Sequence, residues 1–322
     1  MSRYARQIIL PEIGKSGQGK LSQARVLVVG AGGLAAPVLP VLAGAGVGHI
    51  RIVDPDIVER SNLHRQTLFT EVDCGSSKAE IASGRCMAIN SEITAEPLAL
   101  ALTPANAEAL VANADIILDC ADSYAASFIL SDTCLAQRKP LISASVLELS
   151  GYVGAFCGGA PSMRAVFPDA PERGKTCATA GVLGSVVATI GAMQAHMALA
   201  VLLGLAPSPL GQMVQFDGRT FRTNSFRFEN APEPANPLHF EDTSALSKQD
   251  LIIDLRSAEE APDPAHPDAI RILPPDVSDQ LPDAGKQRLA LCCASGLRAW
   301  QLGEKLQPNW PGEIVLVAAS TT

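Results

Sequence analysis

The chain has 322 residues, of which 47% are hydrophobic and 18% are charged, and its formal net charge is −8 at pH 7. This length and apolar content suffice for a soluble protein of about two globular domains. The acidic balance excludes the class of nonspecific nucleic-acid-binding proteins, which need clustered Lys and Arg. We therefore expect no nucleic-acid partner.

The first predicted unit is a strand, a glycine turn and a helix. An apolar strand at 26–29 precedes a turn that contains Gly30, Gly32 and Gly33, and an apolar helical stretch then runs to Ala45. Small residues let the backbone amides at a helix start approach phosphate oxygens. The turn predicts a nucleotide site, and on its own it favours NAD(P)- or FAD-binding enzymes.

The residues after the second predicted strand change the expected cofactor. The strand at 50–53 ends on Asp54, whose carboxylate can accept hydrogen bonds from ribose hydroxyls. Arg65 and Lys78 follow. A hydride-transferring enzyme needs a neutral pocket for its nicotinamide or flavin ring, whereas such cations neutralise a triphosphate. The segment therefore favours ATP.

Several separate motifs carry a resemblance to one known family. They are Arg3-Tyr4-Ala5-Arg6-Gln7-Ile8, the Gly30–Ala35 turn, Val53-Asp54-Pro55-Asp56, Ser61-Asn62-Leu63-His64-Arg65-Gln66, Lys78 and Leu118-Asp119-Cys120-Ala121-Asp122-Ser123. In order and spacing they resemble the MoeB/ThiF family, bacterial relatives of ubiquitin-activating enzymes that adenylate the C-terminal glycine of a small sulfur-carrier protein. The resemblance implies an α/β fold with a Rossmann-like adenylation domain of the ubiquitin-activating type.

The resemblance also implies roles for individual residues. Gly33 would lie against the phosphates, Asp54 would hold the ribose, Arg65 and Lys78 would clamp the phosphate chain, and Asp122 would hold a magnesium ion. Such cations stabilise the charge that develops when a carboxylate attacks the α-phosphorus of ATP. The implied nucleotide site also includes Gly30, Gly32, Ser61, Asn62, Ser123 and Arg6, the last reaching into the partner subunit's site of a homodimer.

The chain departs from the family pattern at two metal sites. The usual acidic-asparagine pair near magnesium is here Asp122-Ser123. Family members also commonly have two C-x-x-C pairs that bind a structural zinc, but this chain has no cysteine at either place, 161–168 and 226–230. Because tetrahedral zinc needs four N or S ligands, we expect no structural zinc.

The eight cysteines show no C-x-x-C pattern, and no secretory leader precedes them. We therefore expect a cytoplasmic protein without a disulfide framework. Cys177 follows Lys175 in a polar loop before a long helix, and it matches a cysteine that family members use in persulfide or thioester chemistry. A helix start and a lysine both lower a thiol pKa. Cys177 therefore either takes part in covalent catalysis or is a loop thiol with no catalytic function.

Residues 182–205 contain no charge and are long enough to span a membrane. Gln194 and His196 interrupt the stretch, and no flanking basic loops or aromatic belts appear. The resemblance favours a helix buried between the domain and its dimer partner, with His196 in the interior. We expect no membrane association.

A proline-rich, polar stretch at 230–238 predicts a linker between an adenylation domain at 1–229 and a smaller domain at 239–322. Strands are predicted at 251–256 and 289–292 in the smaller domain, and a helical stretch follows the second one. This arrangement favours a small α/β domain.

The smaller domain resembles a rhodanese. Asp254-Leu255-Arg256 matches the acidic-strand motif, and Cys293 falls at the sulfur-carrying position. Loop amides and Arg298 would keep a Cys293 persulfide ionised. Ala294 replaces a residue that is commonly charged, so a degenerate domain is the alternative.

We therefore predict an adenylyltransferase that uses ATP and Mg²⁺ to activate the Gly-Gly tail of a ubiquitin-like sulfur carrier. Sulfur from a donor such as a cysteine desulfurase would pass through a Cys293 persulfide to give a carrier thiocarboxylate, directly or through a disulfide with Cys177. Three alternatives are a family enzyme that activates a peptide or other carboxylate, an NAD-dependent Rossmann oxidoreductase, and a non-catalytic scaffold.

Overall fold

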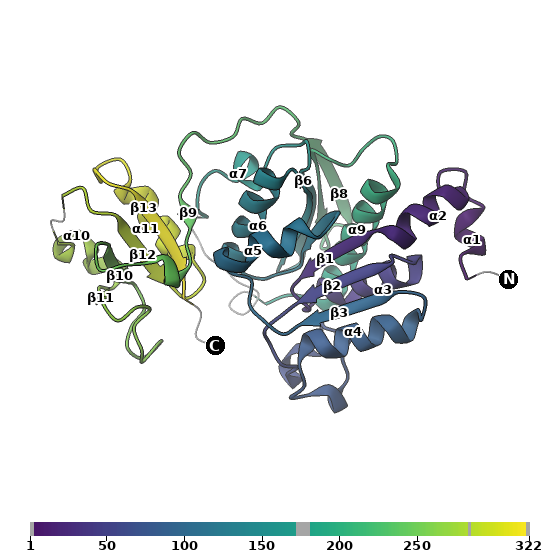
Figure 1. The fold of residues 1–322 in the computed structure, drawn as a ribbon, viewed down its shortest axis with the longest axis horizontal. Coiled ribbons are helices and arrows are strands. Elements are labelled where there is room, and N and C mark those ends of the chain that lie inside the picture. The colour runs from purple at the N-terminus through teal and green to yellow at the C-terminus, as the bar shows by residue number, and fades with distance from the viewer. Residues whose placement is uncertain (1–2, 172–180, 283–284, 320–322) are drawn as a thin grey trace.

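A computed structural model of the protein describes residues 3–171, 181–282 and 285–319. Two β-sheets organise the chain, a large one at the centre of Figure 1 and a small one to its left. We call the parts built on them the large unit and the small unit. Residues 231–238, between the two units, contain no helix or strand.

The large sheet has eight strands, of which the first five in spatial order are parallel and the rest alternate in direction. In that order they are β3 (Thr94–Leu98), β2 (His49–Val53), β1 (Arg25–Val29), β4 (Ile116–Asp119), β5 (Pro140–Leu147), β6 (Ser150–Cys157), β7 (Gln212–Asp217) and β8 (Arg222–Arg227). The predicted Rossmann-like α/β fold is confirmed. The strand order reverses between β1 and β4, which is the place where open α/β sheets bind ligands.

Helices cover both faces of the large sheet, because the parallel strands are apolar on both sides. In β1, Val26 and Val28 pack on one face, and Leu27 and Val29 pack on the other. The helices of this unit are α1 (Ala5–Ile8), α2 (Gly14–Gln23), α3 (Ala35–Ala45), α4 (Lys78–Ile89), α5 (Pro104–Ala112), α6 (Tyr124–Gln137), α7 (Met163–Val166) and α9 (Gly184–Leu203). Residues of α3, α4 and α9 share the first face, and those of α5 and α6 share the second.

Helix α9 corresponds to the long uncharged stretch of the sequence. Its length and composition would allow it to cross a membrane, but 56% of its apolar window is buried inside the molecule. Gln194 anchors it, because its Nε2 donates to the carbonyl oxygens of Asp119 (2.7 Å) and Ile142 (3.0 Å). His196 is exposed on the single chain, and because the expected burial involves a dimer partner, its interior position stays a prediction.

The small sheet has five parallel strands, in the order β11 (Ile270–Arg271), β10 (Leu251–Asp254), β12 (Leu289–Cys293), β13 (Ile314–Ala318) and β9 (His239–Phe240). Two helices accompany it, α10 (Val277–Gln280) and α11 (Leu297–Leu306). The predicted strands at 251–256 and 289–292 correspond to β10 and β12. Helix α11 packs on β12 and β13.

The small unit packs on α6 of the large unit (Figure 1). The rings of Phe128 and Trp300 meet edge to face, with 4.5 Å between their centroids. Gln301 Nε2 donates to the Pro171 carbonyl at 2.6 Å. His239 Nδ1 lies 3.0 Å from the carboxylate of Asp132 on α6. The two units therefore share apolar and polar contacts in addition to the connecting segment.

One buried carboxyl group lies at the end of β4. Asp119 is 1% exposed, and it accepts hydrogen bonds from Ser143 Oγ (2.7 Å) and the Ala121 amide (3.2 Å). Burial raises the pKa of Asp119 to about 6, although these hydrogen bonds oppose the shift.

Asp119→Asn should change the pH dependence of stability. Because the folded-state pKa is raised, the stability contributed by Asp119 is present below about pH 4 and is lost as the pH rises through about 6. From pH 4 to pH 7 the wild type should therefore lose up to about 3 kcal/mol of unfolding free energy relative to the variant. Urea unfolding of both proteins at each pH measures this difference. If the unfolding free energies of the two proteins changed in parallel with pH, the raised pKa of Asp119 would be contradicted.

A matched pair of glycine substitutions should show that the fold requires a glycine at position 30 and does not require one at position 44. Gly30 has φ +91°, and an added Cβ would lie 2.6 Å from the Cys120 carbonyl oxygen, whereas Gly44 in α3 has open space. Gly30→Ala should lower the unfolding free energy by roughly 2 kcal/mol or more. Gly44→Ala should raise it by about 0.5–1 kcal/mol. Equal effects in denaturant unfolding would contradict the close approach of the turn to β4.

Candidate functional site

A cavity of about 660 Å³ opens where the strand order reverses, beyond the carboxyl ends of β1, β2 and β4. It brings together residues that are far apart in the sequence. The predicted site residues that line it are Gly30, Gly32, Gly33, Asp54, Arg65, Lys78, Asp122 and Ser123.

The glycine turn passes between β4 and α9 with little room on either side. An added Cβ at Gly33 would lie 2.9 Å from Val187 Cγ1 of α9. Gly32, in contrast, faces open space apart from Gln66 Nε2 at 3.6 Å. Bare backbone therefore lines this wall of the cavity, as close contact with phosphate oxygens requires.

Asp54 is held at the end of β2. Its carboxylate accepts hydrogen bonds from the backbone amides of Ala31 (2.6 Å) and Asp56 (2.8 Å), and the side chain is 5% exposed. Burial raises the pKa of Asp54 despite these bonds. The carboxylate keeps lone pairs for further donors, so it can accept hydrogen bonds from ribose hydroxyls.

Two cations line the same cavity. Lys78 is the first residue of α4 and is only 6% exposed, and its Nζ donates to Asp56 Oδ2 at 2.8 Å. Arg65 Nη1 lies 2.8 Å from the His64 ring Nε2. These contacts orient both cations before a ligand arrives, which suits them to hold a polyphosphate.

Asp122 fits the expected magnesium ligand. Among the residues that the structure describes, its side chain has no hydrogen bond or ion pair, although it lines the cavity. Magnesium prefers oxygen ligands and commonly binds through one or two carboxylates together with substrate phosphates. One carboxylate beside the glycine turn, in a cavity that Arg65 and Lys78 also line, matches that pattern. Ser123 lines the cavity next to it.

Some predicted site residues lie elsewhere. Ser61 and Asn62 are on a 3-10 turn, η1 (Arg60–Asn62), outside the cavity lining, and Asn62 Nδ2 donates to Ser61 Oγ at 3.3 Å. Arg6 is exposed and does not line the cavity of its own chain. Cys177 lies outside the described residues. Their roles stay predictions.

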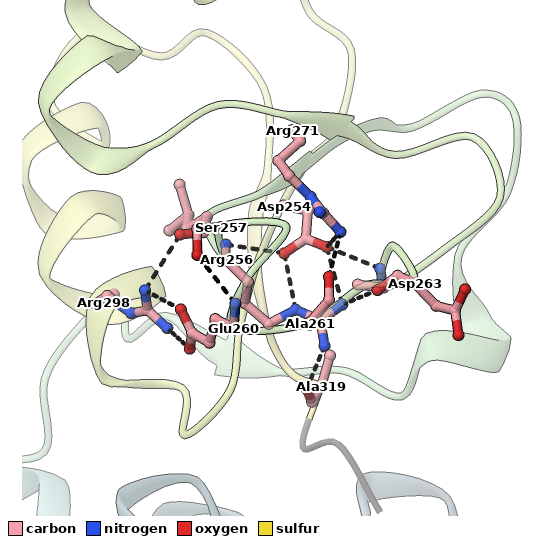
Figure 2. Close-up of polar contacts among 11 residues, drawn as sticks. Asp254, Arg256, Ser257, Glu260, Ala261, Asp263, Arg271, Arg298 and Ala319 are labelled. Carbon is pink, nitrogen blue, oxygen red and sulfur yellow. Dashed lines mark hydrogen bonds and ion pairs between the residues drawn. The ribbon is translucent and has the colours of Figure 1, made fainter.

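Cys293 lies at the end of β12, and Arg298 lies near the start of α11 (Figure 2 shows Arg298). Cys293 is fully buried, and its Sγ accepts a weak hydrogen bond from the Ala299 amide at 3.4 Å. Arg298 forms two hydrogen bonds with Glu260, one of 2.9 Å, and this partner raises the pKa of Arg298 above its ordinary value. The guanidinium is therefore fixed near the cysteine loop rather than freely mobile.

Glu260 belongs to a loop that Asp254 and Arg256 organise (Figure 2). Arg256 Nε and Nη2 each donate to the Asp254 carboxylate at 2.9 Å, and the Ala265 amide donates to it at 2.9 Å. Burial opposes ionisation, but these donors lower the pKa of Asp254. The acidic-strand motif thus shapes the loop that presents Glu260 to Arg298.

The small unit also contributes residues to the cavity that Asp54 and Lys78 line. Its lining residues there are Phe240, Glu241, Asp242, Thr243, Ala294 and Ala318. Sequence reasoning did not identify these residues, since none has a motif for nucleotide binding.

Contacts with other residues hold each of the two segments, 161–168 and 226–230, at which the sequence lacks the family's cysteine pairs. Glu233 accepts hydrogen bonds from Ser162 N (2.7 Å) and Ser162 Oγ (2.6 Å). The ring of Phe228 stacks on that of Phe156, with 5.1 Å between the ring centroids. Within the described ranges, no group of three or more His, Cys, Asp or Glu side chains could hold a metal ion. The absence of structural zinc stays a prediction.

Comparisons with known proteins place the chain in a family. Residues 4–238 match the sequence model of the ThiF family. The adenylyltransferase and sulfurtransferase MOCS3 of Bos taurus is 44% identical over 218 residues, 67% of this chain and 48% of that protein. The SAMP-activating enzyme E1 of Haloferax volcanii is 37% identical over 239 residues, 74% of this chain and 87% of that protein.

The chain spans about half the length of the MOCS3 relatives. Among solved structures, Escherichia coli MccB with ATP is similar in fold, with a TM-score of 0.64 at 23% identity over 73% of this chain and 74% of that chain. The family match covers more than half of the chain and agrees with the predicted resemblance, so this chain belongs to the ThiF family.

Proposed function

We propose that this chain is an adenylyltransferase that uses ATP and Mg²⁺ to activate the C-terminal glycine of a ubiquitin-like sulfur carrier. The observation that carries the proposal is the convergence of Asp54, Arg65, Lys78 and Asp122 with the glycine turn on one cavity. The printed names of the relatives, adenylyltransferase and sulfurtransferase MOCS3 and SAMP-activating enzyme E1, support the same chemistry.

The cavity residues account for the first step. The glycine wall and Asp54 hold the nucleotide, and Arg65 and Lys78 bind its phosphates. A carboxylate oxygen of the carrier tail attacks the α-phosphorus, the bond to the bridging oxygen breaks, and pyrophosphate leaves. A magnesium ion on Asp122 would neutralise part of the charge on the phosphate oxygens. The product is the carrier acyl-adenylate.

For the second step, we propose that residues 239–322 form a rhodanese-like domain that accepts sulfur on Cys293 from a donor such as a cysteine desulfurase. The terminal persulfide sulfur attacks the acyl carbon and AMP leaves, which joins the carrier to Cys293 through a disulfide. A Cys177 thiolate then attacks Cys293 Sγ. The sulfur–sulfur bond breaks, the carrier thiocarboxylate is released, and a Cys177–Cys293 disulfide forms, which a cellular dithiol reduces.

Cys292 is not suited to replace Cys177 in this step. Successive residues of a strand point to opposite faces of a sheet, and Cys292 packs with Val315 and Val317 while Cys293 packs in the cluster that contains Leu291 and Trp300. The adjacent thiols therefore lie on opposite sides of the small sheet.

We further propose that the enzyme is a homodimer. Arg6 is exposed on α1 and lies outside its own cavity. This location is compatible with a contact to nucleotide bound in the partner subunit, which the resemblance implies.

Lys78→Ala and Asp122→Ala should each abolish carrier-dependent exchange between pyrophosphate and ATP. The first removes a phosphate cation, and the second removes the magnesium ligand, so each should lower the exchange rate by about 100-fold or more. Lys248→Ala is the control, because Lys248 is exposed and lies outside the cavity lining. Retained exchange in both site variants would exclude this cavity as the adenylation site.

Cys293→Ser should abolish formation of the carrier thiocarboxylate while leaving pyrophosphate exchange intact. Cys292→Ser should retain both activities, because that thiol lies on the other face of β12. Cys177→Ser should stop the reaction at a carrier–Cys293 disulfide, which intact-protein mass spectrometry detects. Thiocarboxylate formation by the Cys293→Ser protein would refute the sulfur role of the small unit.

A further inference from the structure

The loop that follows Cys293 forms part of the wall of the nucleotide cavity. Ala294 and Ala318, at the ends of neighbouring strands β12 and β13, line the cavity together with Phe240, Asp242 and Thr243 of the small unit. The part of the lining that comes from the large unit includes Gly33, Arg65 and Lys78. Parallel strands of both sheets thus direct their carboxyl ends at one space.

The Cys293 loop is held tightly in this position. Gly296, with φ +83°, approaches so closely that an added Cβ would lie 2.4 Å from Phe240 Cε1 and 3.1 Å from Ala125 Cβ. Ala125 is in the first turn of α6, which begins directly after Asp122 and Ser123. The loop therefore lies against the helix start that follows the expected magnesium ligand.

The contacts that fix the small unit against α6 make this approach stable. Arg164 donates to both oxygens of Asp132 at 2.6 Å and 2.9 Å, and His239 reaches the same carboxylate. Burial acts to raise the pKa of Asp132, but the contacts with His239 and Arg164 lower it below its ordinary value. The contact between His239 and Asp132 and the edge-to-face contact between Phe128 and Trp300 therefore join the small unit to α6.

Cys293 itself has no exposed surface, whereas its neighbour Ala294 is partly exposed and lines the cavity. A reagent that reaches Cys293 must pass between loop atoms, and the cavity lies on the Ala294 side. We propose that the reactive sulfur of the donor reaches Cys293 through the nucleotide cavity, so that bound ATP and sulfur loading exclude each other. The inference rests on the proposed ATP site, and it implies that Cys293 is loaded with sulfur before ATP binds.

This order has a chemical consequence. A persulfide formed first would lie at the wall of the cavity in which the acyl-adenylate is made, so transfer would follow activation without exposure of the mixed anhydride to water. Excluding water from such a site protects a reactive intermediate from hydrolysis.

Thiol modification of the full-length protein tests the exclusion. Methyl methanethiosulfonate converts a thiolate to a methyl disulfide and releases methanesulfinate, and mass spectrometry of peptides measures the rate at each cysteine. Cys74 is the internal control, because it is an exposed free cysteine outside the cavity lining. At an ATP concentration 100 times its dissociation constant, about 1% of the protein is free of nucleotide, so the Cys293 rate should fall by about 100-fold. The Cys74 rate should not change.

A parallel measurement of thermal stabilisation by ATP separates the possible results. Stabilisation by ATP with an unchanged Cys293 rate would overturn the shared access route and leave the proposed function standing. An unreactive Cys293 in nucleotide-free protein would overturn the route as well. Failure of ATP to stabilise the protein would refute the proposed ATP site and, with it, this inference.

Discussion

One geometric constraint governs the site: the carboxyl ends of parallel strands from two sheets converge on one space. In the large sheet the chain leaves β1 in one direction and returns to its other side at β4, which opens a crevice at their ends. The small sheet closes that crevice with residues at the ends of β9, β12 and β13. Glycines, carboxylates and cations then share a space that no single unit encloses.

Burial and hydrogen-bond partners fix the positions of the charged groups in this cavity. Lys78 is almost buried but paired with Asp56, so the desolvated ammonium is compensated. Asp54 is buried among backbone donors, and burial raises its pKa. A polyphosphate would bring the anionic charge that Arg65 and Lys78 can bind. These charged groups therefore suit a polyphosphate ligand better than a nicotinamide ring, which needs a neutral pocket.

The sequence predicted the elements with strong local signals. The apolar runs at 26–29 and 50–53, the glycine turn and the uncharged helix have patterns that depend on neighbouring residues only, and each is present. The long-range pairs were not predictable, since Arg298 and Glu260 are 38 residues apart and no periodicity connects them. The apolar stretch around His196 shows the same limit, because such a stretch does not reveal which face of a helix a neighbouring element of the same chain covers. The lining by Ala294 and Asp242 arises only when the two units pack.

The central claim is that metal-bound ATP occupies the cavity between the two sheets. A crystal structure of the protein with Mg²⁺ and a nonhydrolysable ATP analogue tests it most directly. The account predicts phosphates against Gly33, Arg65 and Lys78, a metal ion on Asp122, and the ribose at Asp54. An empty cavity under saturating ligand, or a nicotinamide cofactor bound there instead, would contradict the account.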